Sequence, residues 1–164
     1  MVMGDGMLGQ MMEPVEFKER PKKELPAKDW AANGLNGRKT HNIINSLYLE
    51  ADVLEKHNIH LQSKYAEIKK NEVRYELFNC EENCDLIIVA YGTTSRICKN
   101  VVKWATKEGL KVGLIRPITL WPFPTEAFEK TIDKTKYGYL SVEMSCGQMV
   151  EDIRLSVKDR KSVV

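Results

Sequence analysis

Hydrophobic residues recur every seven positions in the second quarter of the chain. The repeat runs through Leu47, Leu54, Leu61, Ile68 and Tyr75. Seven residues are close to two turns of an α-helix, so these side chains share one helical face. Asn58 and Glu72 interrupt that face, which argues against a long coiled coil. The pattern therefore predicts a long or broken amphipathic helix over residues 43–79, packed on its own domain or on a partner.

Short apolar runs alternate with amphipathic segments after Asp85. The runs predict strands at 86–90, 111–115 and 139–144, and the segments that follow them predict helices at 94–107, 125–134 and 147–157. This alternation is typical of a parallel sheet that is covered by helices on both faces and built from right-handed crossovers. The sequence therefore predicts an α/β domain with a mostly parallel sheet over residues 80–164.

The first quarter of the chain shows neither the seven-residue repeat nor the alternation of apolar runs with amphipathic segments. Residues 1–42 contain three prolines, five glycines and a dense run of charges from Glu16 to Glu24. Prolines and glycines interrupt regular structure, and clustered charges oppose burial. We expect this segment to be an extended connector with little core of its own.

The most distinctive loop follows the second predicted strand. Pro117 ends that strand, and Pro122 and Pro124 fix the backbone just before the next helix. A rigid loop at the carboxyl end of a parallel strand lies where α/β proteins place binding surfaces. Arg116, Trp121 and Phe123 are therefore candidates for an interface. The alternative is a packed connection in which Trp121 belongs to the core.

A second candidate is the turn at Gly92, Thr93 and Thr94, which opens the first predicted helix of the α/β region. Free backbone N–H groups at a helix start, together with nearby hydroxyls, can bind an anion. The turn lacks the further glycines of a dinucleotide-binding fingerprint. An ordinary helix cap by Thr93 or Thr94 is therefore the stronger interpretation.

Composition narrows the function classes. The 164 residues include 43% hydrophobic residues and carry a formal charge of +2, which fits one globular domain and gives no large positive field for nucleic acid or a membrane surface. No apolar run approaches the roughly 20 residues that span a bilayer, and the chain lacks a signal-like start, so we expect a cytoplasmic protein. The four cysteines have no two-residue spacing, so we expect no metal or iron–sulfur site in this chain.

Four segments together resemble one enzyme family. They are residues 116–124 (RPITLWPFP), 4–16 (GDGMLGQMMEPVE), 90–96 (AYGTTSR), and 142–144 (VEM) followed by 147–150 (GQMV). Taken in their order along the chain, they are similar to the alpha-type subunit of 2-oxoacid:ferredoxin oxidoreductases, particularly the 2-oxoisovalerate (3-methyl-2-oxobutanoate) members. The proline loop resembles that of the 2-oxoglutarate enzymes as well, so these stay the alternative.

The resemblance implies a fold and a division of labour. The fold is a three-layer αβα domain like the carboxyl-terminal domain of transketolase, over residues 80–164, with residues 1–42 holding the end of a pyrimidine-binding domain and the connector. The parent enzyme decarboxylates a branched-chain 2-oxo acid to acyl-CoA and passes electrons to ferredoxin. Its thiamin diphosphate, Mg²⁺, iron–sulfur clusters and coenzyme A are expected on other segments.

This chain then corresponds to a carboxyl-terminal fragment that is inactive alone and binds none of these cofactors. Its expected partners are a companion beta-type subunit that binds the diphosphate, a ferredoxin-type subunit, and the missing amino-terminal domain of its own subunit. An independent α/β module for a phosphate-bearing ligand, or a pure assembly module, are the other hypotheses that the residues leave open.

Overall fold

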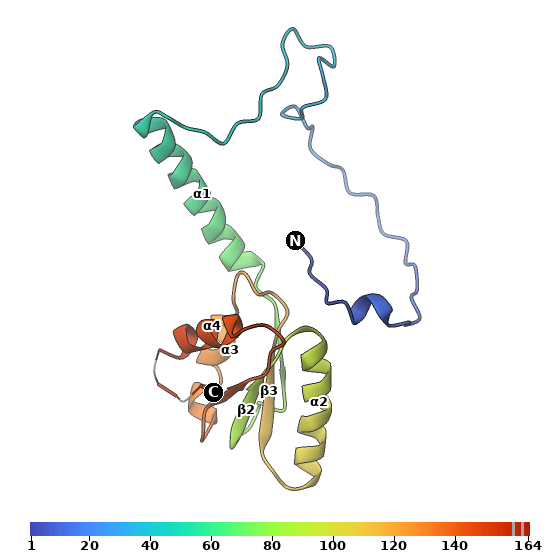
Figure 1. Ribbon diagram of the computed structural model, residues 1–164, viewed down its shortest axis with the longest axis vertical. Helices are drawn as coiled ribbons and strands as arrows, with labels where there is room; N and C mark the ends of the chain where they lie inside the picture. The colour runs from blue at the N-terminus through green and yellow to red at the C-terminus, as the bar shows by residue number, and fades with distance from the viewer. Residues whose placement is uncertain (159, 162) are drawn as a thin grey trace. The chain divides into compact units, whose positions relative to one another are not determined.

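The computed structural model describes residues 1–158, 160–161 and 163–164 and is shown in Figure 1. The chain forms two compact units. One consists of residues 1–11 and 64–164, and the other of residues 12–63. The predicted division at residues 42 and 79 stays a prediction.

The larger unit is built on a four-stranded sheet in the order β1-β3-β2-β4. Its strands are β1 (Tyr75–Phe78), β2 (Leu86–Val89), β3 (Val112–Pro117) and β4 (Tyr139–Ser141). Strand β2 pairs in parallel with both β3 and β4, whereas β1 pairs antiparallel with β3. The mostly parallel sheet of the prediction is confirmed, with one antiparallel strand at its edge.

Helices cover both faces of this sheet (Figure 1). They are α2 (Gly92–Lys107) on one face, and α3 (Thr125–Glu129) and α4 (Gln148–Val157) on the other. The core has two corresponding layers. Cys98 and Val102 of α2 lie in the same buried cluster as Leu114 of β3, and Phe128 of α3 and Ile153 of α4 belong to the other cluster. The three-layer αβα prediction is confirmed.

Gly113, near the amino-terminal end of β3, lies too close to two cysteine side chains to carry a side chain of its own. A Cβ atom at Gly113 would lie 2.7 Å from the Sγ atom of Cys80 and 3.1 Å from that of Cys84. Both thiols are free and buried. Burial raises the pKa of Cys80 to about 11, so this side chain stays a neutral, packing thiol.

The predicted helix over residues 43–79 is only partly correct. Helix α1 (Ala51–Asn71) occupies its centre, residues 43–50 are not helical, and Tyr75–Phe78 form strand β1. Tyr75 fits the seven-residue repeat, yet residues 73–77 also alternate between apolar and polar, and pairing with β3 favours the strand. No residue of α1 is buried.

Two other predicted elements are shorter than expected. The helix at 125–134 divides into α3 and a 3₁₀ turn at Ile132–Lys134. Between them the Thr131 hydroxyl donates a hydrogen bond to the carbonyl of Ala127, at 2.9 Å, and competes with the regular helical pattern. The strand at 139–144 ends at Ser141, because the chain leaves the sheet there and brings Glu143 to the start of α4.

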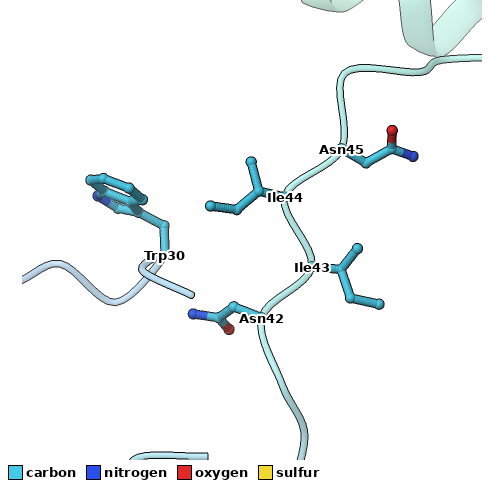
Figure 2. Close-up of a pocket in the computed structure, with 5 residues that line it drawn as sticks. All are labelled: Trp30, Asn42, Ile43, Ile44 and Asn45. Atoms are coloured by element: carbon cyan, nitrogen blue, oxygen red, sulfur yellow. The ribbon is translucent and has the colours of Figure 1, made fainter. Parts of the chain in front are cut away.

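The smaller unit contains a loop that is held by side chains. Within residues 12–50 the structure shows no helix or strand. The Arg38 guanidinium donates hydrogen bonds to the Asn33 side chain at 2.9 Å and to the Gly34 carbonyl at 2.8 Å. Asn42 donates to the carbonyls of Asp29 and Ala31. A shallow pocket of about 410 Å³ lies in this loop. Figure 2 shows Trp30 and Ile44, two of the residues that line it.

Candidate functional site

The candidate site lies at the end of the sheet where the parallel strands terminate. Strands β2, β3 and β4 are parallel, so their carboxyl ends meet there, and the antiparallel β1 begins at the same end. The loops that follow these ends span residues 90–91, 118–124 and 142–147. Open α/β sheets bind ligands at the carboxyl ends of their strands. All six predicted site residues belong to β3, α2 or these loops.

The turn at the start of α2 has no side-chain cap. Gly92 has a φ of +56°, which favours glycine there. The hydroxyl of Thr94 donates to the Tyr91 carbonyl at 2.6 Å, and that of Ser95 donates to the Gly92 carbonyl at 2.7 Å. Both hydroxyls donate to backbone carbonyls, and neither accepts a hydrogen bond from a backbone N–H group at the helix start. The expectation that a threonine caps this helix is therefore wrong.

Thr93 differs from its neighbours. Its Oγ1 atom is buried and makes no hydrogen bond of regular geometry within the described part of the chain. It lies close enough to the Asp5 carboxylate to hold the pKa of Asp5 below its usual value, together with the N–H of Leu8. An anion site at Gly92, Thr93 and Thr94 stays a prediction.

The start of α4 is occupied by a carboxylate of the chain itself. Glu143 accepts hydrogen bonds from the backbone N–H groups of Met149 and Val150, each at 3.0 Å. The hydroxyls of Ser141 and Ser145 also donate to it. A negative group at a helix amino terminus interacts favourably with the helix dipole. The Glu143 carboxylate therefore already occupies the position at this turn where an external anion would bind.

The environment of Glu143 favours its charged form. Partial burial acts to raise its pKa, but the hydrogen bonds from Ser145, Met149 and Val150 outweigh burial, and the pKa lies below its usual value. The Ser145 hydroxyl also shares a hydrogen bond of 2.9 Å with the Tyr91 hydroxyl. This network joins the end of β2 to the end of β4. Glu143 is not among the predicted site residues, although a glutamate shortly before a predicted helix is a sequence signal for such a contact.

Arg116 lies in an ion cluster on the face of the sheet that α2 covers. Its Nη1 atom is 3.2 Å from Glu76, and the Lys99 ammonium is 2.6 Å from the other oxygen of the same carboxylate. Lys99 and then Arg116 lower the pKa of Glu76. The cluster ties the edge strand β1 to β3 and α2, which is a role within the domain. An interface role for Arg116 stays a prediction.

The two aromatic residues of the proline loop have different environments. The Phe123 ring stacks on the buried Phe128 ring, with centroids 5.7 Å apart, and anchors the loop to the core. Trp121 is 57% exposed, and its ring meets that of Tyr65 edge to face at 5.6 Å. The alternative that placed Trp121 in the core is therefore wrong.

Within residues 1–158, 160–161 and 163–164, no group of three or more His, Cys, Asp or Glu side chains is arranged to hold a metal ion.

Among the helices that the structure describes, none has the length and apolar character needed to cross a bilayer.

Known proteins resemble this chain in sequence and in fold. Residues 84–164 match the family model of pyruvate:ferredoxin oxidoreductase core domain II. The chain is 44% identical, over 94% of its length, to the ketoisovalerate oxidoreductase subunit VorB of Methanothermobacter marburgensis. It is 27% identical, over 93% of its length, to the 2-oxoglutarate synthase subunit KorA of Archaeoglobus fulgidus. In both cases it spans 43% of the relative, less than half of that protein.

A solved structure supports the fold. The 2-oxoglutarate:ferredoxin oxidoreductase from Magnetococcus marinus, with 2-oxoglutarate, coenzyme A and succinyl-CoA bound, superposes with a TM-score of 0.51 at 22% identity. The match covers 76% of this chain and 21% of that chain. At this identity the likeness concerns the fold alone. The sequence matches and the shared fold agree, and the chain belongs to the 2-oxoacid:ferredoxin oxidoreductase family, with a sequence similar to the VorB type of subunit.

Proposed function

We propose that this chain is a non-catalytic part of a ketoisovalerate-type subunit. The parent enzyme oxidatively decarboxylates branched-chain 2-oxo acids to acyl-CoA and transfers the electrons to ferredoxin. One observation carries the choice of substrate class. At nearly equal coverage, the identity is 44% to the ketoisovalerate subunit and 27% to a 2-oxoglutarate subunit. The 2-oxoglutarate type is the second candidate.

The internal pairing at the strand ends supports a scaffold role. Glu143 fills the helix start at α4, and Glu76 binds both Arg116 and Lys99. Groups that are paired within the domain gain little from an external ligand, because binding would first have to break these contacts. In this proposal thiamin diphosphate, Mg²⁺, the iron–sulfur clusters and coenzyme A are held by other segments of the complex.

Exposed apolar residues support a role in assembly. Helix α1 buries none of its side chains, and Val53, Leu54 and Ile59 are all exposed. When a partner covers apolar side chains that are exposed to water in the single chain, the free energy of the complex is lowered. The proposed partners are the companion beta-type subunit, the ferredoxin-type subunit and the amino-terminal domain of the same subunit.

Co-expression tests this proposal. The chain is expressed with the companion subunits and the amino-terminal domain, and the complex is isolated by a tag on the companion subunit. We expect a stoichiometric complex that oxidises 3-methyl-2-oxobutanoate faster than 2-oxoglutarate, with methyl viologen as acceptor. A complex that prefers 2-oxoglutarate would favour the second candidate, and absence of any complex would contradict the assembly role.

An independent phosphate-binding module predicts a different result. A ligand that binds only the folded state raises the melting temperature as its concentration increases. Coenzyme A or thiamin diphosphate should therefore stabilise such a module, whereas the scaffold proposal predicts no change.

A further inference from the structure

A groove lies between the carboxyl-terminal end of α1 and the loop that follows β3. Lys69 and Lys70 line one side, and Trp121 and Phe123 line the other. Its volume is about 480 Å³. These residues all belong to the larger unit, in which the edge-to-face contact between Tyr65 and Trp121 joins the helix to the loop.

The groove has a net positive charge. Its one acidic residue, Glu126, forms an ion pair of 2.5 Å with Lys130 and is already neutralised. Over the residues whose positions are described, neither Lys69 nor Lys70 forms an ion pair. Two uncompensated ammonium groups beside an exposed tryptophan favour an occupant that combines a negative charge with apolar surface.

The character of the groove favours a protein segment over a small molecule. Small-molecule sites are commonly enclosed and fix their ligand with a few rigid polar groups. Here the charged groups are flexible, exposed lysines, which act as point charges without a fixed geometry. Tryptophan, in contrast, is enriched among the residues that dominate protein–protein binding energy.

We propose that this groove, defined by Lys69, Lys70, Trp121 and Phe123, binds an acidic, apolar peptide segment of a partner subunit. The partner's aliphatic or aromatic side chain packs on Trp121, and its carboxylates pair with Lys69 and Lys70. This inference rests on the proposed assembly function and adds to it the place of contact and the chemistry of the partner.

Peptide binding to the full 164-residue chain tests the groove directly. The probe is a capped hexapeptide of alternating leucine and glutamate with an uncharged fluorescent label, followed by anisotropy. A peptide with lysine in place of glutamate tests the sign of the charge, and ADP as competitor tests for a small-molecule anion site. We expect saturable binding of the acidic peptide alone, weakened by salt, with no competition from ADP.

Matched variants locate the binding. Lys69→Ala with Lys70→Ala should weaken binding at least about ten-fold, whereas Lys103→Ala with Lys107→Ala, an exposed pair on α2, should leave it unchanged. Trp121→Ala should have a similar large effect, and Trp104→Ala, which removes a tryptophan that is 64% exposed elsewhere, should have none. Circular dichroism identifies any variant that fails to fold, and Lys70→Glu then replaces it.

The possible outcomes separate this inference from the proposed function. Three results would contradict the proposed binding in the groove. They are equal binding of both peptides, displacement by ADP, and equal effects of the groove and control variants. If the co-expressed complex still assembles with Lys69→Ala and Lys70→Ala at wild-type affinity, the groove is wrong and the assembly role remains. If the acidic peptide binds as expected but no complex forms, the assembly role is wrong.

Discussion

The αβα body and the loop of residues 29–45 are held together in different ways. In the body, apolar side chains such as Ile87 and Phe128 are fully buried between the sheet and its helices. In the loop, Arg38 and Asn42 bind backbone carbonyls, while Trp30 and Ile44 remain exposed. The body therefore gains its stability from its own core, whereas the loop is held by polar contacts and keeps its apolar side chains exposed.

The largest expected effect comes from the same substitution in the two regions. Ile87→Ala should lower the free energy of unfolding by about 2–5 kcal/mol, because it removes buried methyl groups and leaves a cavity. Ile44→Ala should change it by less than about 0.5 kcal/mol, since Ile44 is 67% exposed. Urea unfolding followed by circular dichroism measures both values. Equal effects would show that the loop contributes to the core, against this comparison.

A smaller effect is expected at the amino-terminal end of β3. Gly113→Ala should cost about 1–3 kcal/mol, because the new methyl group would collide with the Sγ atom of Cys80. Gly9→Ala is the matched control, since no atom lies within 4 Å of a Cβ at that position. If thermal unfolding shows the same melting temperature for both variants, the close packing of Gly113 on the two cysteines is wrong.

The Glu143 network should give the body a specific pH dependence. Its folded pKa is lowered, so its stabilisation is complete above the unfolded value of about 4.3 and is lost as the pH falls through the folded pKa. Glu143→Gln should cost about 1 kcal/mol at pH 7, the usual value of a helix cap. The difference between wild type and variant should shrink below about pH 4. A constant difference from pH 7 to pH 3 would contradict the role of the charge.

The smallest expected effect is none. Millimolar coenzyme A or thiamin diphosphate with Mg²⁺ should leave the melting temperature of the chain unchanged, because the scaffold proposal places these ligands on other segments. Differential scanning fluorimetry measures this. A melting temperature that rises with ligand concentration would assign a binding site to the body and favour the independent module.

Sequence patterns predicted the body better than its edge. The alternation of apolar runs and amphipathic segments indicated the three parallel strands, since buried parallel strands are continuous in their hydrophobicity. The sequence predicts a helix where strand β1 lies, because Tyr75 satisfies a seven-residue repeat and an alternating pattern at once. Four residues are too few to separate the two periods, and pairing with β3 decides between them.

The site was less predictable than the fold. The position of Trp121 and Phe123 at a strand end followed from the prolines, but their different exposure depends on which ring reaches Phe128. Glu143 was missed because its partners, Met149 and Val150, are backbone groups six and seven residues away. The sequence signal for such a contact is a carboxylate within one turn of a predicted helix start.

The scaffold claim is tested most directly by a steady-state assay of the purified chain alone. The assay supplies 3-methyl-2-oxobutanoate, coenzyme A, thiamin diphosphate, Mg²⁺ and methyl viologen, and follows viologen reduction under anaerobic conditions. We predict no rate above the protein-free control, together with activity when the companion subunits and the amino-terminal domain are present. Sustained reduction of the dye by the isolated chain would contradict the account.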